Sequence, residues 1–117
     1  MLKQNPECRF EFYLRLGYFY LTVDNEKSVA VLTRALAENK KSPLGWIGLG
    51  KAYYYMANYD KSKTALNQAN VYDPNNPEIW AYLALNLLKS KTDINMVNQC
   101  LKELFKLDIK EEKDRLI

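Results

Sequence analysis

The sequence predicts an all-α fold made of three helical hairpins, and three observations support this prediction. Residue identities recur at a spacing of 34 positions, helix-start signals recur with them, and apolar residues follow one another at steps of three and four. An internal repeat of this length indicates a structural unit that stacks against copies of itself. The residues that recur 34 positions apart are Pro43 and Pro77, Trp46 and Trp80, Leu49 and Leu83, Lys27 and Lys61, Ser28 and Ser62, and Leu32 and Leu66.

Each copy is expected to hold two helices joined by a polar turn. Asn5, Ser42 and Asn76 each precede a proline, and this pair marks a helix start because the missing N–H of proline has no partner at the first helical position anyway. The turns around residues 22–26, 57–60 and 91–95 are rich in Asp, Asn and Thr, which favour turns. The expected first helices cover residues 6–23, 43–56 and 77–90, and the expected second helices cover 26–38, 59–71 and 94–106.

The three hairpins should form one domain, 1–117, because 117 residues are enough for one hydrophobic core and few for two. A single helix pair leaves an apolar stripe open, so neighbouring pairs are expected to stack, with small residues such as Gly17 and Gly50 where helices approach closely. Asp108 and Glu111 resemble a capping box, which predicts a separate short last helix. The expected repeats cover residues roughly 6–39, 43–73 and 77–107, and the expected terminal helix covers 109–116.

Composition argues against several classes of function. The chain lacks histidine, the commonest general base and metal ligand, and two cysteines alone cannot hold zinc, so no catalytic centre, metal site or cofactor is expected. The excess of 17 Lys and Arg over 14 Asp and Glu is small for a nucleic-acid binder, and no apolar run approaches the roughly 20 residues of a membrane helix. The count leaves a disulfide between Cys8 and Cys100 open, but a cytoplasmic protein with two free, packed thiols is the interpretation we favour.

These repeats resemble the tetratricopeptide repeat (TPR) family. The middle copy carries nearly the whole motif, although Ser62 stands where that motif usually has Ala. The third copy has Ile109 in place of the closing proline, and the first has Tyr13 in place of the tryptophan. The resemblance implies a right-handed superhelix that is a non-catalytic scaffold for protein–protein interaction. The motif residues of the middle copy are Trp46, Leu49, Gly50, Tyr53, Tyr59, Leu66, Ala69 and Pro74.

A narrower resemblance rests on the runs 42–54 and 65–89 and on a chain end that is rich in Lys and Leu. These stretches are similar to the C-terminal repeats of the cilia- and flagella-associated protein 70 family. That resemblance implies a fragment of a larger protein of the ciliary or flagellar axoneme, a cytoskeletal assembly, with a role in cilium assembly or motility.

In a superhelix of this kind the first helix of each pair lines the concave inner surface. We expect a groove there for a peptide or protein segment with apolar anchors and some acidic residues, such as a segment of an axonemal protein. Tyrosine is enriched at interface hot spots, which favours this interpretation over the alternative that the same side chains merely cover the inner surface or contact a folded-back C-terminal helix. The residues expected to bind the partner are Leu14, Tyr18, Leu21, Ile47, Lys51, Tyr54, Tyr55, Tyr82, Leu85 and Lys89.

One chemistry of the family, capture of the C-terminal carboxylates of chaperone tails, is not expected. Family members that do this use a clamp of basic and amide side chains. The matching positions hold Leu14, Tyr18, Gly48, Glu78 and Tyr82, and none of them is the Lys, Asn or Arg that the clamp requires.

Two alternative functions stay open at this point. Lysines at positions 102, 106, 110 and 113 recur at steps of three or four and could contact nucleic acid, although the acidic residues between them favour a solvated face. Alternatively, apolar residues at the ends of the stack could pair copies of the chain as a homo-oligomer or contact other parts of a larger protein. The residues expected there are Leu2, Phe10, Leu104, Ile109 and Ile117.

Overall fold

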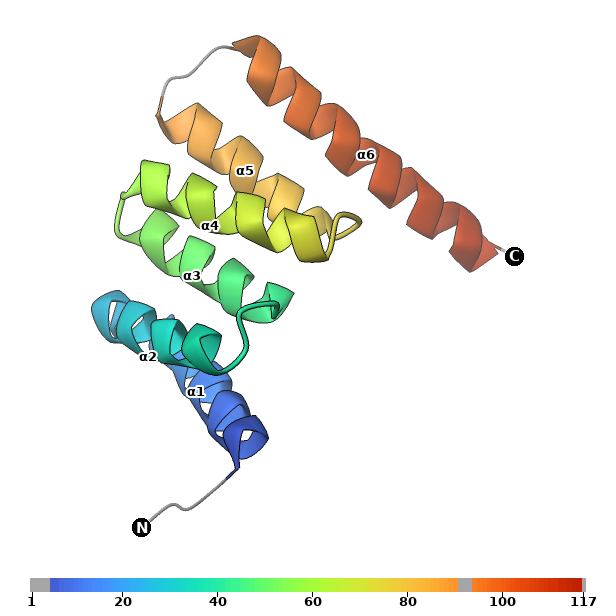
Figure 1. Ribbon diagram of the computed structural model, residues 1–117. Helices are drawn as coiled ribbons and strands as arrows, with labels where there is room; N and C mark the ends of the chain where they lie inside the picture. The colour runs from blue at the N-terminus through green and yellow to red at the C-terminus, as the bar shows by residue number, and fades with distance from the viewer. Residues whose placement is uncertain (1–4, 91–93, 117) are drawn as a thin grey trace.

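The computed structural model describes the backbone of residues 5–90 and 94–116, and the side chains of residues 5–90, 95, 96 and 98–107. Every regular element in these ranges is a helix, so the all-α prediction is confirmed. The helices form a stack that runs from α1 at one end to α6 at the other (Figure 1). They are α1 (Pro6–Tyr20), α2 (Asn25–Glu38), α3 (Pro43–Tyr55), α4 (Tyr59–Tyr72), α5 (Pro77–Lys89) and α6 (Ile94–Leu116).

The first helix of each pair begins where the cap residues and prolines predict. The side chain of Asn5 accepts a hydrogen bond from the Cys8 N–H at 2.9 Å, and Ser42 Oγ accepts one from the Gly45 N–H at 3.2 Å. Asn76 caps α5 in the same manner. Each cap satisfies a backbone N–H that has no partner inside its helix, and the proline that follows starts the first turn.

The turn between α1 and α2 is longer than predicted. Helix α1 ends at Tyr20 rather than at residue 23, and Thr22 Oγ1 donates to the Phe19 carbonyl at 2.9 Å beyond its end. Asp24 then caps α2, which begins at Asn25, one residue earlier than predicted. The hydroxyl and carboxylate side chains of this turn bond to nearby backbone groups, and such bonds compete with helix continuation.

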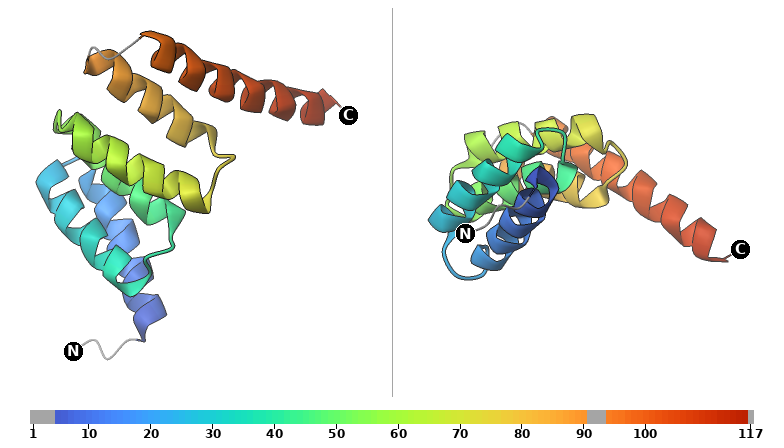
Figure 2. Two further views of the ribbon diagram at one scale, coloured as in Figure 1. Left: turned by 45° about the horizontal axis from the view of Figure 1, so that its top comes forward. Right: turned by 60° about the horizontal axis from the view of Figure 1, so that its bottom comes forward.

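The prediction of a separate terminal helix is wrong, because α6 continues without a break to Leu116. The chain between residues 106 and 111 contains neither proline nor glycine, and Ile109 stands where the middle repeat has Pro74. Without a helix breaker the backbone keeps its hydrogen bonds, so Asp108 and Glu111 lie one turn apart inside the helix rather than at a cap. The C-terminal part of α6 therefore extends beyond α5 (Figures 1 and 2).

Glycines and buried serines bring the two helices of a pair into close contact. A Cβ atom at Gly17 would overlap the Leu32 side chain, so only glycine allows α1 and α2 this approach. Ser28 Oγ donates to the Gly17 carbonyl at 2.7 Å, and Ser62 Oγ donates to the Gly50 carbonyl at the same distance. Because the two contacts recur at the repeat spacing, serine at the position that is usually alanine has the same structural role in both hairpins.

Stacking of the hairpins buries two apolar clusters. The first cluster joins α1, α2, α3 and α4, and the second joins α3, α4 and α5. Trp46 packs against both, and its Nε1 donates to the Lys40 carbonyl at 2.8 Å. The buried members of the first cluster are Leu14, Leu32, Leu36, Leu49 and Ala65, and those of the second are Ile47, Leu66, Ala69, Ile79 and Leu83.

Candidate functional site

The first helices of the three pairs contact one another, since α3 contacts both α1 and α5. Their contacts bring together a group of side chains that we call the tyrosine face. Five of its six members are among the residues that the sequence predicts to bind a partner, and Glu78 joins them through an ion pair with Lys51. The tyrosine face consists of Tyr18 on α1, Lys51, Tyr54 and Tyr55 on α3, and Glu78 and Tyr82 on α5.

Three tyrosines form an aromatic cluster at the α3–α5 contact. The rings of Tyr54 and Tyr82 have centroids 5.5 Å apart and an interplanar angle of 85°, and those of Tyr55 and Tyr82 have values of 6.3 Å and 86°. The hydroxyl oxygens of Tyr55 and Tyr82 are 2.7 Å apart and share a hydrogen bond. Edge-to-face contacts of this kind are favourable, so the rings are held in place while Tyr55 stays 51% exposed.

Lys51 lies at the centre of the tyrosine face. Its Nζ is 2.7 Å from Glu78 Oε2, and it lies 5.8 Å from the ring centroid of Tyr18 and 5.5 Å from that of Tyr82. The Lys51 side chain is only 17% exposed, and a partly buried ammonium needs such an ion pair and such aromatic neighbours to offset its lost hydration. The central positive charge of the face is therefore already balanced within the protein.

Tyr18 forms the edge of the tyrosine face on the α1 side. Its hydroxyl donates to the Leu44 carbonyl at 2.6 Å, and its ring covers Gly48, where an added Cβ would lie 3.1 Å from the ring carbon Cζ. Burial raises the pKa of the Tyr18 phenol well above its usual range, and the Glu78 charge raises that pKa further. Burial likewise raises the pKa of Tyr82, so both hydroxyls stay protonated and able to donate.

A hollow of about 390 Å³ lies beside this cluster and is open to solvent. Its volume is within the range of sites that hold small ligands, and it could receive an apolar side chain of a partner. Leu21, one of the residues expected to bind the partner, belongs to its lining. Thr22, which lies one turn after Tyr18, is a member that helical spacing on α1 did not single out. The lining residues are Tyr18, Leu21, Thr22, Lys51 and Tyr55.

Two of the predicted partner-binding residues lie in the core instead. Leu14 is 8% exposed and belongs to the first cluster, and Ile47 is fully buried in the second, which corrects their assignment to an open surface. Both lie on the same helix face as the tyrosines, but their side chains pack against apolar residues of neighbouring helices. Leu85 and Lys89 are exposed and follow Tyr82 along α5 at helical spacing, outside the tyrosine face itself.

The positions of the carboxylate clamp are blocked in this chain. Leu14 is buried, Gly48 lies beneath the Tyr18 ring, and Glu78 carries the same charge as a carboxylate ligand. Lys51, a cation beside these positions, is paired with Glu78. A terminal carboxylate placed here would meet the Glu78 charge rather than a set of donors.

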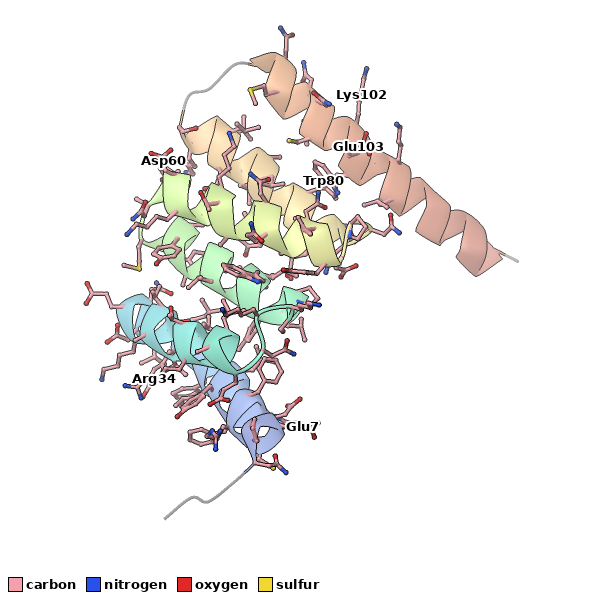
Figure 3. The ribbon with its side chains drawn as sticks, viewed as in Figure 1. Glu7, Arg34, Asp60, Trp80, Lys102 and Glu103 are labelled. Carbon is pink, nitrogen blue, oxygen red and sulfur yellow. The ribbon has the colours of Figure 1, made fainter. Side chains whose placement is uncertain are left out.

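The two cysteines are free and differ in their environment. Cys100 packs against the second cluster and lines a pocket of about 200 Å³ together with Trp80 and Leu83, as expected for a packed thiol. Trp80 lies between α5 and α6 (Figure 3). Burial raises the pKa of the Cys100 thiol, which disfavours a reactive thiolate. Cys8 is exposed, and its predicted packing is wrong.

The basic stripe on α6 is mixed with acidic charge. Lys102 and Lys106 are exposed, and Lys106 Nζ is 3.6 Å from Glu103 Oε1. Lys102 points away from α5 (Figure 3). The side chains of Lys110 and Lys113 lie outside the described residues. This arrangement favours a solvated helix face over a strip of phosphate contacts.

Among the described side chains, those of residues 5–90, 95, 96 and 98–107, no group of three His, Cys, Asp or Glu comes together as metal ligands would. None of the helices described within residues 5–90 and 94–116 combines the length and the apolar character needed to cross a membrane.

Comparison with known proteins links the chain to a family. Residues 1–113 match the family described as the cilia and flagella-associated protein 70 C-terminal domain. The chain is 34% identical over 100 residues to cilia- and flagella-associated protein 70 of Macaca fascicularis and, to the same extent, to that of Homo sapiens. The aligned segment covers 86% of this chain but 10% of the macaque protein and 9% of the human protein. The chain thus spans about a tenth of the length of these relatives.

Solved structures with the same fold are TPR proteins and the protein MamA. The second TPR of Spaghetti (RPAP3), bound to the HSP90 peptide SRMEEVD, matches with a TM-score of 0.75 at 14% identity, over 86% of this chain and 91% of that one. MamA MSR-1 C2 matches with 0.80 at 17%, over 87% and 59% of the two chains. A crystal structure of MamA matches with 0.75 at 23%, over 92% and 61%. At these identities the likeness establishes the TPR-like fold alone.

Proposed function

The chain belongs to the family of the C-terminal domain of cilia- and flagella-associated protein 70, and on this premise we propose that it is a non-catalytic scaffold whose tyrosine face binds a peptide or protein segment. The TPR-like fold of the chain suggests a general role in protein interaction. The proposal rests on one observation in particular, the partly exposed aromatic cluster of Tyr54, Tyr55 and Tyr82. We place this scaffold in a larger axonemal protein that supports cilium assembly or motility.

The physical support for this role is the rigidity of an exposed apolar surface. Tyr55 is half exposed, and its hydroxyl shares a hydrogen bond with that of Tyr82, so little conformational entropy is lost when a partner covers the ring. Tyrosines of this kind are enriched among residues that dominate binding energy. Truncation of such a ring costs about 1–2 kcal/mol, which corresponds to roughly 5- to 30-fold in affinity.

The chemistry of the tyrosine face suggests an internal segment as the ligand. Apolar anchors would pack against Tyr55 and Leu85, and one of them would enter the hollow. Lys89 is exposed and could contact an acidic residue of the partner, whereas Lys51 is already paired with Glu78. The structure of Spaghetti holds an acidic HSP90 peptide, which supports peptide binding on this fold. Because the carboxylate clamp is blocked, we propose that the segment binds without presenting its C-terminus.

A nucleic-acid partner is the weaker alternative. The lysines of α6 are interspersed with acidic residues, and Lys106 is paired with Glu103. Such a partner would show a steep loss of affinity with salt, because each phosphate contact releases counterions. A flat gel-shift titration at low salt would exclude it.

The proposal can be tested with a defined probe and a matched pair of variants. A peptide-display library is selected on the purified chain, and the affinities of enriched peptides are measured by calorimetry. Tyr55→Ala should weaken binding roughly 5- to 30-fold. Tyr72→Ala removes a tyrosine that is also exposed, at 39%, but lies on α4, and it should leave affinity unchanged.

Equal affinities in Tyr55→Ala and the wild type would contradict the assignment of the tyrosine face. The ciliary part of the proposal needs a separate measurement. Proximity labelling in ciliated cells, with the same two variants in the complete parent protein, should recover axonemal proteins with the Tyr72→Ala form and fewer with the Tyr55→Ala form. Equal recovery would show that the interaction uses another surface.

A further inference from the structure

We propose that the two ends of the helix stack bind each other head to tail in separate copies of the chain. In this arrangement α1 of one copy lies against α6 of another, as α3 lies against α2 within the chain. The proposal concerns surfaces at both ends of the stack and is independent of the tyrosine face. It rests on a comparison of equivalent positions in the three repeats.

One helix face is covered in α3 and open in α1. A Cβ atom at Gly45 would lie 2.7 Å from Leu36 Cδ2, so this position of α3 touches α2. Ala52 lies two turns further along the same face and is fully buried. The equivalent residues of α1, 33 positions earlier, are Phe12 and Phe19, which are 52% and 58% exposed.

Helix α5 repeats the covered arrangement. The residues that correspond to Gly45 and Ala52 are Ile79 and Asn86, 34 positions later, and both are buried. Ile79 packs in the second cluster with residues of α4, and Asn86 Nδ2 donates to Ser62 Oγ of α4 at 2.9 Å. At both joints within the chain, this face of a first helix is therefore covered by the preceding second helix.

Helix α6 has an open face at the other end of the stack. Helix α2 receives α3 through Leu32 and Leu36, whose side chains lie closest to Gly48 and Gly45. After offsets of 34 and 35 positions the equivalent residues of α6 are Leu101 and Phe105, and Phe105 is 58% exposed. The surface around these residues is open to solvent and is formed by α6 alone, at the place where the next first helix would lie. Its members are Asn95, Asn98, Gln99, Leu101, Lys102 and Phe105.

The structure revises the end residues that the sequence predicts. Phe10 is half-buried and packs against the first cluster, and Leu104 is also half-buried, so neither is the main exposed group of its end. The exposed aromatic residues are Phe12 and Phe19 on α1 and Phe105 on α6. The other three predicted residues, at positions 2, 109 and 117, lie outside the described side chains.

A second copy of the chain is the occupant that these two faces fit. The end faces of helical-repeat stacks are usually polar, whereas both ends here expose phenylalanine. One face presents Phe12 and Phe19, and the other presents Phe105. On the α1 face Glu11 is paired with Arg15, whose Nε lies 3.5 Å from Glu11 Oε2, which leaves the negative charge of Glu7, whereas Lys102 gives the α6 face a positive charge. Glu7 and Lys102 lie at opposite ends of the stack (Figure 3).

The geometry makes a prediction about assembly. A contact between two different surfaces leaves one open surface on each outer copy, so association should continue into chains rather than stop at a dimer. Sedimentation velocity of the wild-type chain should show an average mass that rises steadily with concentration. A monomer at every concentration, or a mass that stops at the dimer, would overturn the proposal.

Complementary variants give the sharper test. The double variant Phe12→Asp with Phe19→Asp blocks the α1 face, and Phe105→Asp blocks the α6 face, so neither variant should associate alone. Mixed together, each supplies the face that the other lacks, and the average mass should double to that of a one-to-one dimer and rise no further. Val71→Asp is the matched control, since Val71 is 68% exposed on α4, and it should associate like the wild type.

Circular dichroism of each variant establishes that the helices are intact before the masses are compared. If an aspartate variant loses helix, serine at the same positions provides a second set, because it removes the ring without adding charge. Self-association of either blocked variant alone, or no dimer in the mixture, would refute head-to-tail binding.

Discussion

Replacing Ser62 by Ala should destabilise the chain much more than replacing Ser28, although both serines are fully buried at equivalent positions of the repeat. Ser62 Oγ donates to the Gly50 carbonyl at 2.7 Å and accepts from Asn86 Nδ2 at 2.9 Å. Ser28 Oγ makes the same donation, to Gly17 at 2.7 Å. The residue that corresponds to Asn86, 34 positions earlier, is Ala52, and its side chain offers no donor to Ser28.

The magnitude follows from the groups left behind. Loss of a hydrogen bond costs about 1 kcal/mol, which is the whole effect expected for Ser28→Ala. Ser62→Ala also leaves an N–H of Asn86 buried without its acceptor, and this adds about 1–3 kcal/mol. The expected totals are therefore about 1 and about 2–4 kcal/mol, or about 4 °C in Tm for each kcal/mol in a domain of this size.

Urea unfolding followed by circular dichroism measures both values. A double variant, Ser62→Ala with Asn86→Ala, tests the assignment further, because removing both partners leaves no unpaired group. It should lose less than the sum of the two single variants, by about 1–2 kcal/mol. Equal losses in Ser28→Ala and Ser62→Ala, or full additivity in the double variant, would refute the reasoning.

Two further predictions concern single residues. Ala57→Gly should raise the free energy of unfolding by about 0.5–1 kcal/mol. Ala57 has a φ of 60°, which strains an L-residue by about 1–2 kcal/mol, and glycine removes this strain. The greater freedom of glycine in the unfolded chain offsets about 0.4–1 kcal/mol of that gain. A lower Tm in thermal melting would contradict this. Stability should fall as pH rises above about 10, since burial raises the pKa of folded Tyr18 and the unfolded chain therefore binds fewer protons there. Tyr18→Phe should flatten this fall in urea titrations, and an unchanged slope would argue against it.

Local signals predicted the helix starts well and the ends less well. A start is marked by a cap side chain and a proline, as at Asn5, Ser42 and Asn76, and these act on the nearest backbone groups. Helix α6 continues past residue 108 because the sequence there holds no helix breaker. The spacing of Asp108 and Glu111 fits a helix interior as well as a cap. Only the continuous backbone distinguishes the two.

The candidate site was predictable in part. Helical spacing placed Tyr18, Tyr54, Tyr55 and Tyr82 on the side that the first helices share, and the structure brings them together. Spacing could not tell that Leu14 and Ile47, which lie on that same side, are buried in the core, because their burial depends on the neighbouring helices. The end-face phenylalanines could have been found by aligning Phe12 with Gly45 across the repeats.

By itself the sequence determined the repeat, the start of the first helix in each pair and the TPR-like stacking, because these follow from local backbone preferences and from an apolar pattern that recurs along the chain. Only the tertiary structure decided how Lys51 is balanced by Glu78, how three rings share one cluster, and which face each end of the stack leaves open. The physical reason is that these features depend on contacts between side chains in different repeats. The strength of those contacts depends on how deeply the side chains are buried, which is known only once the repeats are packed together.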